Sequence, residues 1–224
     1  MIENSSQIIK EISDNKKIEN SNLVGIFDVD SNRSKEIGEK YNIRAFKNLE
    51  DLLIKVDGVS IVTPTPNHCE TAKLCINHKK HVFIEKPITV TLKEADDLLR
   101  LSKEKETIIQ VGHIERLNPA LIALNSYQIN PKFIEIHRLA PYTSRGTDVP
   151  VVLDKMIHDI DIILSSVDSP IKQISSSGVS VISDTPDIAN ARIEFENGCV
   201  ANLTASRVSL KNMRKTRFFQ SGKY

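Results

Sequence analysis

Short apolar runs alternate with amphipathic stretches in the first half of the chain. We expect strands at the apolar runs, which are Leu23–Phe27, Gly58–Thr63, His81–Ile84 and Ile108–Gly112. The stretches between them carry apolar residues at helical spacing, and we expect helices at Ser31–Tyr41, Leu49–Val56, His68–His78 and Leu92–Glu106. Nearly continuous apolar strands that alternate with helices are typical of a parallel sheet covered on both faces. The pattern therefore predicts a doubly wound α/β domain.

A different pattern begins after about residue 113. Lys132–Arg138 alternates like a half-exposed strand, and Val151–Leu164 has the period of an amphipathic helix. Two further strands flank Asn197-Gly198, which is the strongest short-range signal of a hairpin. This order predicts an α+β domain with an open, mostly antiparallel sheet. We place the two domains at 1–113 and 114–224.

The faces of this hairpin follow from the position of its turn. Pairing directly across Asn197-Gly198 places one set of side chains together, namely Ile193, Phe195, Val200 and Asn202. The opposite face then carries Arg192, Glu194, Ala201 and Leu203.

Charge and composition exclude several classes of partner. The 224 residues include 30 basic and 29 acidic side chains and no Trp, so neither a basic surface nor an aromatic platform for nucleic acid is indicated. No window approaches about 18 consecutive apolar residues, and the N-terminus lacks the pattern of a signal peptide. Three cysteines without a C-x-x-C pair suit reduced thiols. We therefore expect a cytoplasmic protein that binds a small molecule, without nucleic acid or a membrane as partner.

Polar residues follow the expected strands where a doubly wound sheet binds its ligand. Asp28 could accept hydrogen bonds from an adenosine ribose, or it could be an ordinary turn residue. The nearby Arg33 weakens any preference for NAD over NADP. The segment Thr63-Pro-Thr-Pro-Asn-His68 precedes a helix whose free N–H groups could face a nucleotide, although by itself it is a proline-rich loop.

Lys86 is the more specific signal, because it directly follows the expected strand His81–Ile84. A lysine in this crevice can hydrogen-bond a substrate hydroxyl. A cationic cofactor and partial burial would lower its pKa from about 10.4 toward neutrality, as a proton acceptor requires. The alternative is a surface lysine paired with Glu85.

Asp154 and His158 are four residues apart on the expected helix, and so they share one face. An aspartate can orient and charge-stabilise an imidazole that handles a hydroxyl proton. The alternatives are an ion pair on the helix surface and metal ligation. Metal ligation would need further ligands that the sequence does not supply, and we assign no metal site.

Taken together, the motifs resemble those of the glucose–fructose oxidoreductase, inositol dehydrogenase and MocA family. The resemblance runs from about Leu23 to the C-terminus and covers Asp28, Thr63-Pro-Thr-x-x-His68, Glu85-Lys-Pro87, Gly112-His113 and Asp154-x-x-x-His158. A narrower branch, similar to the UDP-N-acetylglucosamine 3-dehydrogenases, is indicated by Val111-Gly-His-Ile-Glu-Arg-Leu-Asn-Pro-Ala120, Arg145-Gly-Thr-Asp148, Met156-Ile-His-Asp-Ile-Asp161 and Ala201-Asn-Leu-Thr-Ala-Ser-Arg207.

The resemblance implies a Rossmann domain, an NAD cofactor with NADP left open, and hydride transfer between a sugar or nucleotide-sugar carbon and nicotinamide. It also implies a cis peptide bond at Lys86-Pro87 and a homo-oligomer formed through the sheet of the second domain. Lys86 and His158 would handle the proton, with Asp154 supporting His158. The implied cofactor-lining residues are Asp28, Thr63, Pro64, Thr65, His68, Glu85, Lys86 and His113.

Three arginines are candidates for a substrate diphosphate or carboxylate, because a guanidinium fork suits such oxyanions. They are Arg116, Arg138 and Arg145, and surface ion pairing is an equal alternative for each of them.

The sequence departs from the family pattern at both ends. The family opens with a strand and a G-x-G-x-x-G loop that receives the pyrophosphate, whereas here no glycine precedes Gly25. The chain also stops at Tyr224, inside an expected strand. We therefore expect a Rossmann-type sheet that lacks its first strand and an incomplete second domain. A non-catalytic remnant or binding subunit with little cofactor affinity is the second hypothesis.

Overall fold

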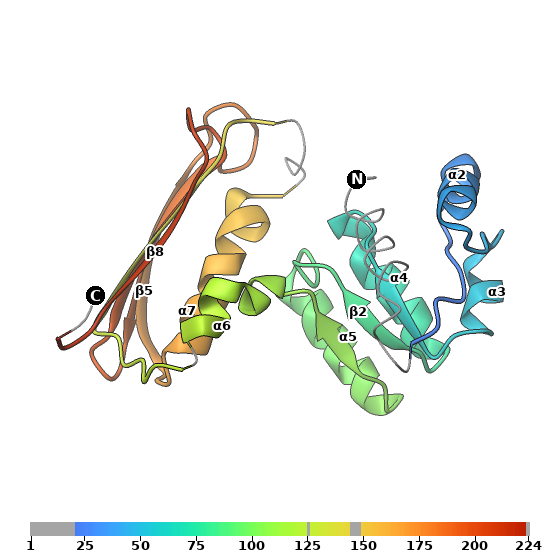
Figure 1. The fold of residues 1–224 in the computed structure, drawn as a ribbon, viewed down its shortest axis with the longest axis horizontal. Coiled ribbons are helices and arrows are strands. Elements are labelled where there is room, and N and C mark those ends of the chain that lie inside the picture. The colour runs from blue at the N-terminus through green and yellow to red at the C-terminus, as the bar shows by residue number, and fades with distance from the viewer. Residues whose placement is uncertain (1–20, 125, 144–148, 223–224) are drawn as a thin grey trace. The chain divides into compact units, whose positions relative to one another are not determined.

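The computed structural model describes residues 21–124, 126–143 and 149–222. The chain divides into two compact units between Gly112 and His113, next to the boundary expected from the sequence. Figure 1 traces the first unit from blue to green and the second from green to red.

The first unit is built on a parallel sheet whose strands alternate with helices (Figure 1). Its strands are β1 (Gly58–Ile61), β2 (His81–Ile84) and β3 (Ile109–Val111), in the order β1-β2-β3. Its helices are α2 (Ser31–Tyr41), α3 (Leu49–Leu53), the short 3₁₀ turn η1 (Thr65–Asn67), α4 (His68–Asn77) and α5 (Leu92–Glu104). This alternation confirms the predicted Rossmann-type α/β domain.

The helices of this unit pack on the sheet through the apolar positions of the predicted pattern. The core gathers residues from β1, β2 and three helices, namely Leu53, Ile61, Ala72, Ile76, Val82, Ile84 and Leu98. α5 begins with a capping box, in which the Thr91 hydroxyl accepts from the Glu94 N–H at 3.3 Å and the Glu94 carboxylate accepts from the Thr91 N–H at 2.9 Å.

The prediction that Leu23–Phe27 is a strand of the sheet is wrong for the described residues, because this stretch pairs with none of β1 to β3. It makes one isolated bridge, between Ile26 and Ala45. The Ile26 N–H donates to the Arg44 carbonyl at 2.9 Å, and the Ile26 carbonyl accepts from Phe46 at 2.8 Å. The only described partner is thus a short stretch after α2, and a ladder needs a partner that stays extended over several residues.

The second unit carries a five-stranded sheet in the order β5-β6-β7-β4-β8. The strands are β4 (Phe133–Leu139), β5 (Ile171–Val179), β6 (Ile188–Phe195), β7 (Val200–Ser206) and β8 (Met213–Phe219). Among the described strands of this sheet only the β4–β7 pair is parallel, so the predicted mostly antiparallel sheet is confirmed. The helices are η2 (Ile114–Leu117), α6 (Pro119–Leu124), the π-helical turn η3 (Val152–Met156) and α7 (Ile157–Ser166).

One face of this sheet is buried against η3 and α7 (Figure 1), and alternate residues of β4, β6 and β7 fill that core. The core includes Ile134, Ile136, Met156, Ile163, Ala191, Ile193, Phe195, Ala201 and Leu203. The side chains between them face away from the core and are more exposed, as expected for a sheet that is open on one side.

The predicted faces of the hairpin are wrong by one residue. Phe195, rather than Glu196, pairs with Cys199: its N–H donates to the Cys199 carbonyl at 2.9 Å, and its carbonyl accepts from Gly198 at 3.0 Å. The loop therefore has three residues, and Gly198 adopts the left-handed φ of 83° that closes it. A slip of one residue exchanges the two faces, so Ala201 and Leu203 join Ile193 and Phe195 in the core.

The predicted helix Val151–Leu164 is also modified. It starts as the π-helical turn η3 and continues as α7, which ends two residues later than expected, at Ser166. The apolar period predicted a helix here correctly, but it does not distinguish a π-helical first turn from an α-helical one.

Candidate active site

The carboxyl ends of β1, β2 and β3 meet at one edge of the first unit's sheet, because these strands are parallel. Beyond the ladder, the Gly112 N–H donates to the Ile84 carbonyl at 2.8 Å. A Cβ added at Gly112 would lie 3.3 Å from Oε2 of Glu85 and 3.2 Å from the ring of Phe83. The missing side chain therefore lets Glu85 approach the end of β3 at the edge where doubly wound sheets bind ligands.

His68 links two of the segments predicted to line the cofactor. Its ring is buried, with Nδ1 2.8 Å from the Pro87 carbonyl oxygen and Nε2 2.9 Å from that of Thr63. The ring donates to at least one of these carbonyls and so joins the Thr63 loop to the Lys86–Pro87 segment. The Lys86–Pro87 bond is cis, as the resemblance implied. Because its ring is buried, His68 supports the edge of the sheet by holding the Thr63–His68 loop in place.

The other predicted residues at this edge are more accessible. Thr63 is exposed, and four of its neighbours at the edge are half-buried, namely Pro64, Thr65, Glu85 and Lys86. They follow β1 and β2 directly, as the sequence predicted.

Asp28 is half-buried and already engaged by its neighbours. Its Oδ1 accepts from the Asp30 N–H at 2.9 Å, and its Oδ2 lies 3.4 Å from Nη1 of Arg33. Asp28 can therefore be a turn residue and still bind a ribose hydroxyl, since one carboxylate has enough acceptor sites for both. The guanidinium beside it is a cation that a 2′-phosphate could also use, which leaves the choice between NAD and NADP open.

In the second unit, Asp154 lies in η3 and His158 in the first turn of α7. A π-helical turn holds more residues than the roughly 3.6 of an α-helix, so residues four apart come closer to alignment along the axis. Both side chains are half-buried. The Asp154 carboxylate also lies 3.3 Å from the Lys155 ammonium.

Two ion pairs hold α7 directly after His158. Arg138 of β4 contacts both carboxylate oxygens of Asp159 at 2.7 to 3.0 Å, and both side chains are buried. Arg116 of η2 binds Asp161 through two hydrogen bonds of 2.8 and 2.5 Å. Bidentate pairs of this kind restrain rotation as well as position. They therefore fix the direction in which the face of α7 that carries His158 points.

The predicted substrate arginines are thus in three different situations. The side chain of Arg138 is only 9 % exposed and is bound to Asp159 and Glu115, which makes it a support of α7. The side chain of Arg116 is 55 % exposed, so part of it remains accessible beside Asp161. Arg145 lies outside the described residues.

Glu115 was not predicted as a site residue, and its carboxylate lies 3.3 Å from Arg138 and 3.2 Å from Arg214. Burial opposes the ionisation of Glu115, but the charges of Arg138, Arg214 and His158 outweigh it and lower its pKa. A sequence signal existed for the partners on α7. Asp159 and Asp161 interrupt an otherwise apolar helix, and buried carboxylates require a cation or hydrogen-bond donors.

His113, predicted to line the cofactor, is the first residue of the second unit. Its Nδ1 lies 3.8 Å from the Asp161 carboxylate and makes no hydrogen bond to the described residues. His113 therefore shares Asp161 with Arg116 on the second unit.

A parallel sheet with polar side chains at its carboxyl edge, followed by a unit that presents an Asp-x-x-x-His helix, defines a dinucleotide-dependent oxidoreductase class. Family models agree. Residues 5–113 match the oxidoreductase family with an NAD-binding Rossmann fold, and residues 130–221 match the GFO/IDH/MocA C-terminal domain. The chain belongs to the Gfo/Idh/MocA oxidoreductase family, and its cofactor is NAD(P).

Among its relatives, the UDP-N-acetylglucosamine 3-dehydrogenase of Acidithiobacillus ferrooxidans is 38% identical over 91% of this chain and 66% of its own length. Its crystal structure superimposes with a TM-score of 0.88, at 35% identity, over 96% of this chain and 70% of that one. The myo-inositol 2-dehydrogenase of Thermotoga maritima is 27% identical over 86% of this chain and 63% of its own length. The chain thus spans about two thirds of the length of these curated relatives.

Within the part of the chain that the structure describes, no helix is long and apolar enough to cross a membrane.

The described residues fit one part of a dinucleotide. Asp28 supplies a half-buried carboxylate shortly before α2, and the Thr63 loop with Glu85 and Lys86 supplies accessible polar groups at the carboxyl edge of the sheet. Groups of this kind can hydrogen-bond ribose hydroxyls and a carboxamide, and the Thr63 loop, Glu85 and Lys86 lie at the edge where doubly wound sheets bind ligands.

Proposed function

We propose that the protein is an NAD(P)-dependent dehydrogenase that oxidises a secondary hydroxyl of a nucleotide sugar. The observation that carries this proposal is the pair Lys86 and Asp154-x-x-x-His158. The lysine follows β2 at the ligand edge of the first unit, and the aspartate and histidine lie on a helix that buried ion pairs hold in place. The 38% identity to a UDP-N-acetylglucosamine 3-dehydrogenase supports the substrate class.

In the proposed reaction the substrate carbinol carbon loses a hydride and its hydroxyl loses a proton, which leaves a ketone. When bound, the nicotinamide supplies the hydride acceptor. Lys86 and His158 hydrogen-bond the reacting hydroxyl, and one of them accepts its proton; Asp154 stabilises the charge that His158 then carries. Lys86 and His158 belong to different units, so their convergence on one hydroxyl stays a prediction.

For the cofactor we propose contacts from Asp28 to the adenosine ribose and from the Thr63 loop, Glu85 and His113 toward the nicotinamide side. For the substrate diphosphate we propose Arg116, which keeps an exposed guanidinium, together with Arg145. We further propose that the protein acts in the cytoplasm as a homo-oligomer formed through the open face of the second sheet.

The test is a purified chain assayed with UDP-N-acetylglucosamine and NAD, following the absorbance of the reduced nicotinamide. Lys86→Met and His158→Asn should each lower kcat by about 10²- to 10⁴-fold, the range for loss of a general acid or base. Lys93→Met, which removes an exposed lysine from α5, is the matched control and should keep the wild-type kcat. Unchanged turnover in either of the first two variants would overturn the residue assignments.

The second hypothesis, a non-catalytic remnant or binding subunit with little cofactor affinity, is tested by calorimetric titration of the same chain with NADH. Binding together with turnover supports the dehydrogenase. If the chain folds but neither binds NADH nor turns over, the proposed function fails and the non-catalytic hypothesis is favoured.

A further inference from the structure

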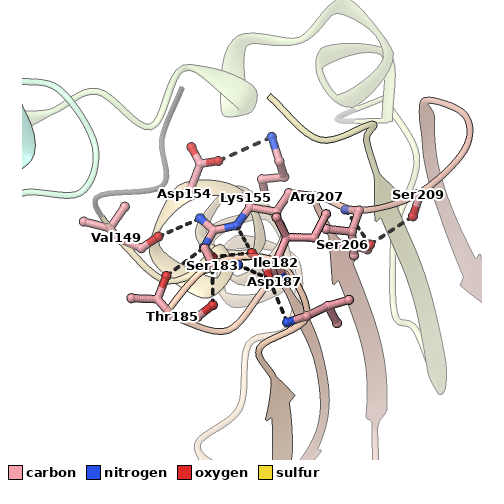
Figure 2. A network of polar contacts seen from close by, with 12 residues as sticks. Val149, Asp154, Lys155, Ile182, Ser183, Thr185, Asp187, Ser206, Arg207 and Ser209 are labelled. Carbon is pink, nitrogen blue, oxygen red and sulfur yellow. Dashed lines mark hydrogen bonds and ion pairs between the residues drawn. The ribbon is translucent and has the colours of Figure 1, made fainter. Parts of the chain in front are cut away.

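Arg207 and Asp187 form a buried ion pair at one end of the second sheet. Arg207 directly follows β7 and is 2% exposed, and Asp187 directly precedes β6 and is 0% exposed. The Arg207 Nε donates to Oδ1 of Asp187 at 2.7 Å, and the two backbones are joined by the Arg207 N–H and the Asp187 carbonyl at 2.9 Å. Figure 2 shows this pair at the centre of a larger polar network.

The guanidinium of Arg207 reaches beyond Asp187 to two other segments. Its Nη1 donates to the Val149 carbonyl at 2.8 Å. Its Nη2 donates to the hydroxyls of Ser183 at 2.8 Å and Thr185 at 2.7 Å. One side chain thus connects the end of β7, the loop before β6 and the backbone that leads into η3 (Figure 2).

Asp187 organises the loop from the other side. Its Oδ2 accepts from the backbone N–H groups of Val181, Ile182 and Ser183 at 2.7 to 3.0 Å. The Ser183 hydroxyl, the backbone N–H groups of Ile182 and Ser183, and Arg207 hold the pKa of Asp187 far below its usual range. The carboxylate therefore stays ionised, and the loop wraps around it.

The network continues along the backbone to Asp154. The Val151 N–H donates to the Pro186 carbonyl at 3.0 Å, directly before Asp187. The Pro150 carbonyl accepts from the Leu153 N–H at 2.9 Å and from the Asp154 N–H at 3.0 Å. Val149 and Val151, on either side of Pro150, are thus hydrogen-bonded to the Arg207–Asp187 network. Pro150 itself accepts a hydrogen bond from the backbone of Asp154.

We propose that Arg207 and Asp187 are positioning residues for the Asp154–His158 pair. A buried ion pair is often no more stabilising than apolar residues of equal volume, whereas its hydrogen bonds define one geometry. Here that geometry fixes the start of the π-helical turn, and with it the direction of the Asp154 side chain along the helix. The ion pairs of Asp159 and Asp161 hold α7 after His158. The Arg207–Asp187 network therefore holds the start of η3, before His158. The role of Asp154 and His158, and so this inference, rests on the proposed function.

The test compares Arg207→Met, Arg207→Lys and Asp187→Asn with the matched control Phe195→Leu. Phe195 is buried in the core of the same unit but lies at the opposite end of β6 from Asp187, about 26 Å away at roughly 3.3 Å per strand residue. The control therefore lowers stability without touching the network.

Arg207→Met and Asp187→Asn should lower kcat at least 10-fold at temperatures where the variants are fully folded, with the KM for NAD unchanged. Arg207→Lys, which keeps the charge but not the fork, should recover part of the loss. Phe195→Leu should keep the wild-type kcat. The inference is overturned if the folded network variants keep the wild-type kcat, or if the control loses as much.

Hydrogen exchange measured by mass spectrometry gives a readout that does not need activity. Exchange of the amides at 151–155 should rise in Arg207→Met and Asp187→Asn, while α7 beyond Ile160 keeps its protection. Exchange that is unchanged at 151–155, or that rises equally throughout α7, would overturn the inference even in an active enzyme. If the wild-type chain has no activity, the proposed function fails and the exchange data alone decide whether the network orders η3.

Discussion

Buried charges in the second unit are retained as pairs, and Arg138 illustrates why. Its guanidinium is surrounded by the sheet and α7, and it donates to Asp159 three times and to Glu115 once. A guanidinium that has lost its water needs such acceptors, and removal of one partner leaves the other charge uncompensated. The intact Arg138–Asp159 pair adds little net stability, but removal of either side chain should destabilise the fold strongly.

Arg138→Met should lower the free energy of unfolding by about 3 to 5 kcal/mol, the usual effect of breaking a buried pair, because Asp159 would keep a buried charge without its partner. Arg100→Met is the matched control. Arg100 pairs with Asp97 on α5, its side chain is 74 % exposed, and its loss should change the same quantity by less than about 1 kcal/mol. Urea unfolding of the two variants measures both values. Equal effects would show that Asp159 does not depend on Arg138.

Asp187 leads to a prediction about acid stability. Its pKa is lower in the folded chain than in the unfolded chain, where an aspartate titrates at about 3.9. Its contribution is therefore complete above about pH 5 and is lost progressively as the pH falls through the unfolded pKa toward the lower folded pKa. Asp187→Asn should lower stability at neutral pH and reduce the slope of unfolding free energy against pH in the acid range.

The slope is measured by urea unfolding from about pH 5.5 down to about pH 3. Asp184→Asn, which removes an exposed carboxylate from the same loop, is the control and should keep the wild-type slope. A wild-type slope in Asp187→Asn would contradict the linkage.

At the scale of elements, loop length decides how β6 and β7 face the core. The loop Glu196-Asn197-Gly198 places Phe195 opposite Cys199, and the Asn197 side chain accepts from the Cys199 N–H at 3.0 Å. Gly198 has a φ of 83°, and no atom lies within 4 Å of the Cβ it lacks. The backbone conformation, and not steric crowding, is therefore the reason for a glycine here.

Gly198→Ala should destabilise the protein by about 1 to 2 kcal/mol, the usual penalty for a left-handed residue with a Cβ. Gly198→Asn should lose clearly less, because asparagine tolerates this conformation. Thermal unfolding of the two variants gives the comparison. If both variants lost the same stability, crowding or a loss of hydrogen bonds would be the cause instead of φ.

At the scale of the whole molecule, the two units have separate apolar cores. One core lies around β1, β2, α4 and α5, and the other lies between the second sheet and its helices. No residue belongs to both of these clusters of described residues. A cavity in one core should therefore be felt mainly in the unit that contains it.

Leu98→Ala removes a fully buried side chain from α5 and should cost about 2 to 5 kcal/mol. Hydrogen exchange should increase in α4, α5 and β1 to β3, and protection in β4 to β8 should stay at the wild-type level. Leu99→Ala, at an exposed neighbouring position, is the control. Equal deprotection of both units would mean that they unfold as one cooperative structure.

The sequence alone determined most of the strands and helices of the first unit and the helix that carries His158, because the apolar period is a local property of the chain, although Leu23–Phe27 forms no strand of the described sheet. It placed β2 at His81–Ile84 as observed, and it placed Thr63, Glu85, Lys86 and His158 after the strands and on the helix where they lie. These positions follow from runs of apolar residues and from the helical period of about 3.6 residues, and the resemblance to the family then marked them as candidate site residues.

Only the tertiary structure decided which charged groups meet. Arg138 and Asp159 are 21 residues apart, and Arg207 and Asp187 are 20 apart, distances at which no local period carries information. The register of the β6–β7 hairpin and the π-helical turn before α7 were decided in the same way. Each depends on hydrogen bonds to other segments, to Cys199 in the first case and to Pro186 in the second. A local pattern specifies which side of an element is buried, whereas the partner on that side is chosen by the packing of the whole unit.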